Sequence, residues 1–90
     1  MSEHNRTVMV TNRRGLHARA SAKFVTLASQ QACAIEVEKD GSKVTGTSIM
    51  GLMMLGAAMG DSVTITASGP DAERSLELLA GLVEAKFGED

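Results

Sequence analysis

The residue of this sequence best suited to covalent chemistry is His17, which stands between a loop that ends in Gly15 and a segment with helical periodicity. Histidine titrates near neutral pH, so one of its ring nitrogens is available as a nucleophile. The predicted helix has no Ser, Thr, Asp or Asn at its start, so the backbone N–H groups of its first turn lack a capping acceptor. These groups and the positive end of the helix dipole favour an anion beside His17.

Basic residues gather around this histidine: Arg13, Arg14, Arg19 and Lys23. A phosphoryl group on the imidazole would bring about two negative charges. The N–H groups and the Arg19 guanidinium could stabilise that charge through charge-assisted hydrogen bonds. Position alone leaves two hypotheses open: His17 accepts and holds a phosphoryl group, or it merely caps the helix.

Length and composition restrict the class of protein. The 90 residues suffice for one domain, spanning 1–90, with 43% hydrophobic residues but only two Phe and no Trp or Tyr. A single cysteine, Cys33, cannot form an internal disulfide, and the two histidines and the cysteine lack the spacing of metal ligands, so no metal site is expected. We expect Cys33 to be a small buried hydrophobic residue and His4 to lie in a disordered polar tail.

Charge is distributed unevenly along the chain. The net charge is −2, yet residues 1–30 carry +4 and residues 31–90 carry −6. This asymmetry indicates a local site for an anion or an acidic partner on an otherwise acidic protein. The polar N-terminus has no apolar signal core, and no stretch approaches the ~20 apolar residues of a membrane span. A cytoplasmic location without membrane contact is therefore expected.

Hydrophobic periodicity changes several times along the chain. Alternation predicts strands at 7–11, 34–39, 43–45 and 62–67, and helical spacing predicts helices from Leu16 onward, over 49–55, and from Pro70 to Phe87 with Gly88 as the stop. Because the strands have one polar face, the order β-α-β-β-α-β-α favours an antiparallel or mixed sheet with helices packed on the other face. This is a two-layer α+β sandwich.

The segment from Ser48 to Gly56 predicts a second feature of interest, a short helix that is apolar all round with Ser48 as its N-cap. So short a helix cannot bury all its sides, so we expect some of Met50, Met53 and Met54 to be exposed. Leu52 and Leu55 are the better core candidates. Flexible methionines suit a surface that meets several partners.

Two blocks of the sequence resemble the HPr family, the phosphocarriers of the phosphoenolpyruvate-dependent phosphotransferase system. Residues 15–22, Gly15-Leu16-His17-Ala18-Arg19-Ala20-Ser21-Ala22, closely resemble the family's active-site signature, and residues 48–56 resemble its regulatory-serine segment. The spacing of the blocks and the element order also match, so the resemblance covers nearly the whole chain. It implies an open-faced sandwich, in which three helices cover one face of a four-stranded antiparallel sheet.

The same resemblance implies roles for particular residues. His17 matches the histidine that enzyme I phosphorylates on Nδ1, and Arg19 matches the arginine that steadies the phosphoryl group. Ser48 matches the serine that a dedicated kinase, HPr kinase/phosphorylase, modifies in many bacteria. An apolar patch that docks enzyme I and the EIIA-type acceptor domains is matched by Ile49, Met50 and Met53.

The sequence departs from the family at two informative positions. Ala20 stands where the family commonly has proline. We expect this to loosen the first helical turn without abolishing the chemistry, because the nucleophile and its donors remain. Thr47 precedes Ser48, which leaves open which hydroxyl a kinase would choose.

Three functions compete: a phosphocarrier in sugar uptake, an HPr-shaped regulatory module in nitrogen or carbon signalling, and a nucleic-acid binder. RNA-binding domains of similar element order stack bases on strand aromatics, and the predicted strands have none, so no nucleic-acid partner is expected. No second carboxylate, base or metal site accompanies His17. We therefore expect a covalent intermediate in its partners' reaction rather than an enzyme, without a cofactor, and a monomer with transient interfaces.

Overall fold

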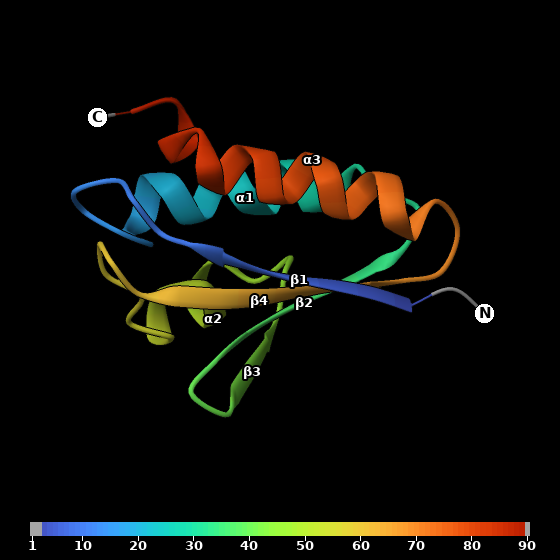
Figure 1. The fold of residues 1–90 in the computed structure, drawn as a ribbon, viewed down its shortest axis with the longest axis horizontal. Helices are drawn as coiled ribbons and strands as arrows, with labels where there is room; N and C mark the ends of the chain where they lie inside the picture. The colour runs from blue at the N-terminus through green and yellow to red at the C-terminus, as the bar shows by residue number, and fades with distance from the viewer. Residues whose placement is uncertain (1–2, 90) are drawn as a thin grey trace.

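The computed structural model, which describes residues 3–89, contains one four-stranded sheet with three α-helices packed on it (Figure 1). The strands are β1 (Glu3–Met9), β2 (Ala34–Lys39), β3 (Ser42–Thr45) and β4 (Ser62–Ser68). The helices are α1 (Ala18–Ser29), α2 (Ile49–Met54) and α3 (Ala72–Glu84), followed by the 3-10 turn η1 (Lys86–Gly88). Strand order is β1-β4-β2-β3 and every pairing is antiparallel. The predicted fold class and element order are confirmed.

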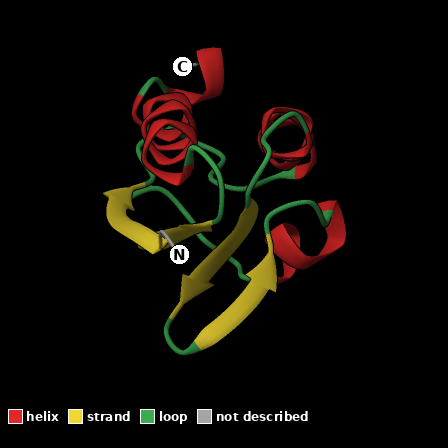
Figure 2. Ribbon diagram, turned by 90° about the vertical axis from the view of Figure 1, so that its right-hand side faces the viewer, coloured by secondary structure: helices red, strands yellow, loops and turns green. Residues whose placement is uncertain are grey.

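The helices lie on one side of the sheet and leave its other face open. Figure 2 shows α1 and α3 end-on, next to each other above the strands, with α2 beside α1 near the β3 edge. Period-two alternation explains this arrangement, because a strand with one apolar face must bury that face against another layer. The buried side chains of the central strands are Ile35, Val37, Val63, Ile65 and Ala67, as the alternation predicts.

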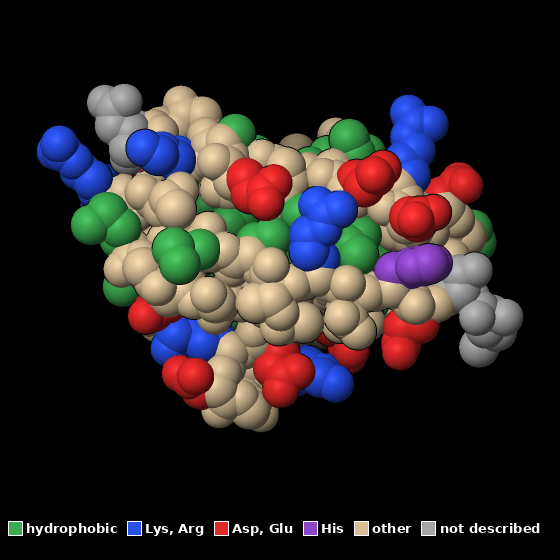
Figure 3. Space-filling view, in the orientation of Figure 1, with side chains coloured by type: hydrophobic (Ala, Val, Ile, Leu, Met, Phe, Trp, Pro, Cys, Tyr) green, Lys and Arg blue, Asp and Glu red, His purple; other side chains and the backbone are tan. Residues whose placement is uncertain are grey.

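The two longer helices, α1 and α3, each contribute an apolar stripe to the core. Phe24 of α1 and Leu79 of α3 are buried, and so is Phe87 just beyond α3. None of the methionines among residues 3–89 belongs to this core, although methionine is a common gap-filler in protein interiors. The outer surface carries side chains of both charges, which alternate over the β2–β3 hairpin in the lower part of Figure 3.

The first strand differs from its prediction. It begins at Glu3 rather than Thr7, and His4, which was expected in a disordered tail, pairs with Ala67 and is half-buried. The physical reason is that β4 is seven residues long and supplies a pairing partner for each residue from 3 to 9. Polar residues suit such an edge strand, so hydrophobic alternation could not reveal it.

The helix boundaries also differ. α1 begins at Ala18 rather than Leu16, because the backbone of His17 is extended, with ψ of −178°, and so cannot belong to the helix. α3 begins at Ala72 rather than Pro70, because its N-cap Asp71 adopts a left-handed conformation with φ of 56°. It ends at Glu84 rather than Phe87. Cys33 is half-buried against the core rather than fully buried.

Candidate functional site

His17 is the N-cap residue of α1, with extended backbone angles of φ −73° and ψ −178°. Its side chain makes no capping hydrogen bond. The Ser21 N–H donates to the His17 carbonyl at 2.9 Å and opens the intrahelical ladder, so the amides at positions 18–20 have no intrahelical acceptor. The first turn also contains no acidic residue. The imidazole therefore stands beside an uncapped positive helix end, as the sequence predicted.

The loop before His17 is fixed by contacts with distant segments. Gly15 has φ of +61°, a left-handed conformation that favours glycine, and a Cβ there would collide with the carbonyl oxygen of Ala57. The adjacent Leu16 N–H donates to that oxygen at 3.0 Å, while the Ser21 hydroxyl donates to the Leu16 carbonyl at 3.1 Å. These contacts join the start of α1 to the chain that follows α2, and so bring the two sequence blocks together.

Guanidinium groups surround the imidazole. His17, Arg13, Arg14, Arg19 and Glu89 line a cavity of about 230 Å³. The three arginines were predicted to gather here, and the structure confirms that they do. Lys23 does not line this cavity, because its ammonium donates to the carbonyl of Phe87 at 2.7 Å. The cavity is thus strongly basic and suited to an anion such as a phosphoryl group.

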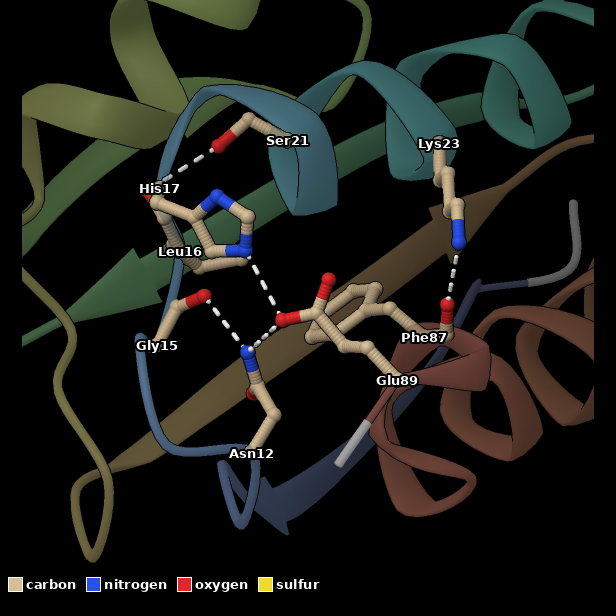
Figure 4. A network of polar contacts seen from close by, with 8 residues as sticks. All are labelled: Asn12, Gly15, Leu16, His17, Ser21, Lys23, Phe87 and Glu89. Atoms are coloured by element: carbon tan, nitrogen blue, oxygen red, sulfur yellow. Dashed lines mark hydrogen bonds and ion pairs between the residues drawn. The ribbon is translucent and has the colours of Figure 1, made fainter.

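Glu89 is a residue of the site that sequence reasoning missed, and the expectation that no carboxylate accompanies His17 is wrong. Its Oε1 atom lies 2.8 Å from Nε2 of His17 and accepts from Nδ2 of Asn12 at 3.0 Å (Figure 4). The hydrogen bond with His17, and then that with Asn12, holds the pKa of the Glu89 carboxyl below its usual value. Position 89 lies 72 residues beyond His17, and no local pattern in the sequence signals that the two meet.

Asn12 was likewise not singled out from the sequence. Its side chain is fully buried, and Nδ2 donates to the Gly15 carbonyl at 2.8 Å as well as to Glu89. Its Oδ1 atom has no hydrogen-bond partner within residues 3–89. Burying a polar atom without a hydrogen-bond partner destabilises the folded state. The orientation of the Asn12 amide is therefore set by the two hydrogen bonds that its Nδ2 group donates.

The second sequence block forms the short helix α2. Ser48 is its N-cap, and its hydroxyl oxygen accepts from the Gly51 N–H at 2.9 Å. Leu52 and Leu55 are buried, as predicted. The outward side chains are exposed to fractions of 41% for Ile49, 71% for Met50, 41% for Met53 and 82% for Met54. The predicted division between core leucines and exposed methionines is confirmed.

Comparison with known proteins agrees with this geometry. A family described as the PTS HPr component phosphorylation site matches residues 4–85. The chain is 40% identical to the phosphocarrier protein HPr of Cupriavidus necator over 84 residues, which cover 93% of this chain and 94% of that protein. The chain belongs to the HPr family. Its members include carriers of a second kind, since it is also 38% identical to the phosphocarrier protein NPr of Shewanella violacea over 99% of this chain and 98% of that one.

Solved HPr structures share the fold. The crystal structure of HPr-C-His from Thermoanaerobacter tengcongensis superposes with a TM-score of 0.90 at 46% identity, covering 100% of this chain and 99% of that one. Membership makes this chain a phosphocarrier component of the phosphotransferase system rather than an enzyme in itself. None of the helices within residues 3–89 has the length and apolar character needed to cross a membrane.

Proposed function

We propose that His17 accepts a phosphoryl group on Nδ1 from enzyme I and passes it to EIIA-type acceptor domains in the cytoplasm. One observation carries this proposal. The Nε2 atom of His17 is hydrogen-bonded to Glu89, whereas Nδ1, the other nitrogen bonded to Cε1, points away from Glu89 and toward the start of α1 (Figure 4). Nδ1 is therefore free of this contact, and a phosphoryl group on it would lie beside the start of α1, where the amides lack intrahelical acceptors.

The transfer step follows from this placement. The Nδ1 lone pair forms a bond to phosphorus while the bond between phosphorus and the donor group of enzyme I breaks, and its electron pair stays with the donor. The phosphoryl oxygens gain acceptor contacts with the first-turn amides and with the Arg19 guanidinium. Arg13 and Arg14 line the same cavity and add positive charge. Onward transfer is the reverse step on an acceptor.

Partner docking is assigned to the exposed apolar patch of Ile49, Met50 and Met53. These side chains project from α2, which packs against α1, so a partner seated on them also reaches the N-terminal end of α1. Methionine adapts its shape to different partners. Such a surface suits a monomeric carrier that forms modest, short-lived interfaces with each protein in turn.

Ser48 is assigned a regulatory role. A phosphate there would stand at the edge of the Ile49–Met50–Met53 patch and would repel an acidic partner. Thr47 remains an alternative target, because it is exposed whereas Ser48 is half-buried and engaged in capping. We expect Ser48→Asp to accept phosphate from enzyme I more slowly than wild type, with Thr47→Asp as the matched comparison. A normal rate for Ser48→Asp would remove Ser48 from this role.

A second candidate function is an HPr-shaped module in nitrogen or carbon signalling. The similarity to an NPr over nearly the full length of both chains favours keeping it. The site chemistry is shared, so the test must use the donor. Cross-phosphorylation by a sugar-type and a nitrogen-type enzyme I separates the two, and the donor with the higher kcat/KM identifies the pathway.

The test of the main proposal is an intact-mass measurement after incubation with phosphoenolpyruvate and enzyme I. We expect an acid-labile gain of one phosphoryl group in wild type and none in His17→Ala. His4→Ala is the matched control, because His4 lies in β1, and it should gain the group normally. A gain in His17→Ala would place the phosphorylated residue elsewhere.

A further inference from the structure

We propose that Glu89 is a positioning residue, whose carboxylate, anchored by Asn12, holds the proton of the neutral His17 imidazole on Nε2 and so keeps the lone pair on Nδ1. This inference rests on the proposed function of His17 and adds to it the device that selects the reacting nitrogen. Neutral imidazole exists as two tautomers, and only one of them offers Nδ1 as a nucleophile.

The proton position follows from what each partner can do. An ionised carboxylate only accepts hydrogen bonds. The pKa of Glu89 is held low by its bonds with His17 and Asn12, so the group is ionised at neutral pH. At 2.8 Å from its Oε1 atom, Nε2 must therefore be the donor. The remaining nitrogen of the neutral ring then carries the free electron pair.

Asn12 fixes the carboxylate in place. Its Nδ2 group donates both to the Gly15 carbonyl and to Glu89. A flipped amide would set its oxygen against both of these acceptors, so the orientation is determined by the pair. The Oδ1 atom stays buried without a hydrogen-bond partner among the described residues. This destabilises the folded state, so the two bonds of Nδ2 are formed at the expense of stability.

The segment that follows α3 places Glu89 beside His17. Phe87 is buried, with an exposed fraction of 1%, and it has a positive φ of 56°. Left-handed angles at non-glycine residues are strained and persist only where the surroundings fix them. Lys23 of α1 donates to the Phe87 carbonyl at 2.7 Å. These contacts turn the chain after α3 back toward the start of α1 (Figure 4).

The charges that face the imidazole come from several elements. Arg13 and Arg14 approach from the loop and Arg19 from α1, while Glu89 is the acidic member among the described residues that line the cavity. Lys23 adds positive charge that favours the ionised form of Glu89. An arginine-rich cavity alone would repel a protonated imidazole. The Glu89 carboxylate offsets this repulsion from the arginines, and it does so on the Nε2 side of the ring, away from a phosphoryl group on Nδ1.

Placement on Nε2 also affects the release of the phosphoryl group. Once the Nδ1–phosphorus bond has formed, the ring still holds its Nε2 proton and bears positive charge, which the adjacent carboxylate stabilises. When that bond breaks toward an acceptor, its electron pair returns to Nδ1 and the neutral Nε2–H tautomer is regenerated. The same contact therefore serves both acceptance and release.

Nitrogen NMR of the unphosphorylated protein tests this inference. The spectra are recorded at about pH 8.5, roughly two units above the ordinary histidine pKa. We expect wild-type His17 to show one protonated nitrogen at Nε2 and one unprotonated nitrogen at Nδ1. In Glu89→Ala the two shifts should move toward each other as the second tautomer becomes populated. The exposed acid Glu84 of α3 provides the matched control, Glu84→Ala, which should leave the shifts unchanged.

Two further variants separate positioning from simple packing. Glu89→Gln retains an acceptor oxygen without the charge, so it should restore much of the single tautomer but not the full rate of phosphoryl acceptance. Asn12→Ala leaves Glu89 in place but removes its anchor, so the population of the second His17 tautomer should increase. Unchanged nitrogen shifts in Glu89→Ala would overturn the inference, even if phosphorylation of His17 proceeds. Phosphorylation of His17→Ala would instead overturn the proposed function, independently of the NMR result.

Discussion

Helices α1 and α2 begin in opposite ways. The N-cap of α2, Ser48, satisfies its own helix by accepting from Gly51, whereas the N-cap of α1, His17, leaves its helix uncapped and turns its side chain to Glu89 instead. At a third start, that of α3, Asp71 makes no side-chain cap, but Glu73 supplies negative charge in the first turn. Only α1 among these three helices begins with neither cap nor acid.

The different starts of α1 and α2 suit different tasks: the start of α1 suits phosphoryl binding, and α2 suits partner docking. An uncapped helix end fixed by buried contacts holds a small anion by directed N–H groups, and needs rigid placement. The capped end of α2 supports flexible apolar side chains, which need only adapt to a partner's surface. The Leu16–Ala57 hydrogen bond joins the chain before α1 to the chain after α2, so one partner can meet both regions. The following changes affect one region while sparing the other.

Gly15→Ala should have the largest effect on phosphoryl acceptance, because it disturbs the loop that supports the uncapped end of α1. The left-handed backbone and the collision with Ala57 should lower the free energy of unfolding by about 1–3 kcal/mol. Phosphoryl acceptance should fall at least about tenfold, since a displaced site loses alignment. Urea denaturation and an enzyme I assay measure the two effects.

The matched control for that change is Gly56→Ala. Gly56 has nearly the same φ, +67°, but nothing lies within 4 Å of a Cβ built on it. It carries the conformational strain without the collision, so it should destabilise the fold less and leave the rate near wild type. Equal losses in both variants would show that strain alone matters and that the Ala57 contact does not hold the site.

Met50→Ala should act on the docking region alone. Met50 is 71% exposed, so the free energy of unfolding should change by less than about 0.5 kcal/mol. Loss of a central apolar contact should raise KM for enzyme I roughly five- to tenfold, the effect of about 1–1.4 kcal/mol of binding free energy, without lowering kcat.

Two controls delimit that result. Met59→Ala removes another exposed methionine, outside the α2 patch, and should leave KM unchanged. Leu52→Ala should cost about 2–5 kcal/mol of unfolding free energy, because Leu52 is buried. A fall in kcat rather than a rise in KM for Met50→Ala would mean that the two regions are not separable in this way.

The pH dependence of Glu89 tests the other region. Its folded-state pKa lies below the usual value of 4.5, so the contact contributes stability above that pH and loses it as the pH falls through the lower folded value. His17→Ala removes the largest cause of the shift, and carbon NMR of the carboxyl should show the pKa of Glu89 rising toward 4.5. His4→Ala should leave it in place; an unchanged value in His17→Ala would contradict the contact.

The two regions also differ in how much of their structure could be predicted from the sequence. Alternation identified the buried faces of β2 and β4, and helical spacing separated Leu52 from Met50, because burial follows local periodicity. The proximity of Asn12, His17 and Glu89 could not be predicted, since it depends on how the chain after α3 turns back over α1. The left-handed residues that make this turn, Lys86 and Phe87, carry no local signal for it.

The smallest expected effect concerns the departure from the family at Ala20. This residue is the third of α1 and is fully buried. Its N–H precedes the first intrahelical donor, Ser21, so proline there removes no helical hydrogen bond. Ala20→Pro should raise the free energy of unfolding by about 0.4–1 kcal/mol through a stiffer unfolded chain.

Ala20→Pro also tests whether the uncapped end of α1 uses the amide at position 20. If the phosphoryl group relies on the amides of Ala18 and Arg19, the rate of phosphoryl acceptance should stay within about twofold, a difference of roughly 0.4 kcal/mol. Ala22→Pro, two residues further into α1, should instead cost about 3 kcal/mol, because it removes the hydrogen bond from the N–H at position 22 to the carbonyl of residue 18. If Ala20→Pro keeps its stability but loses the phosphoryl group faster than wild type at neutral pH, the third amide is a ligand. The site in this chain would then hold the group with one donor more than a proline-bearing relative could offer.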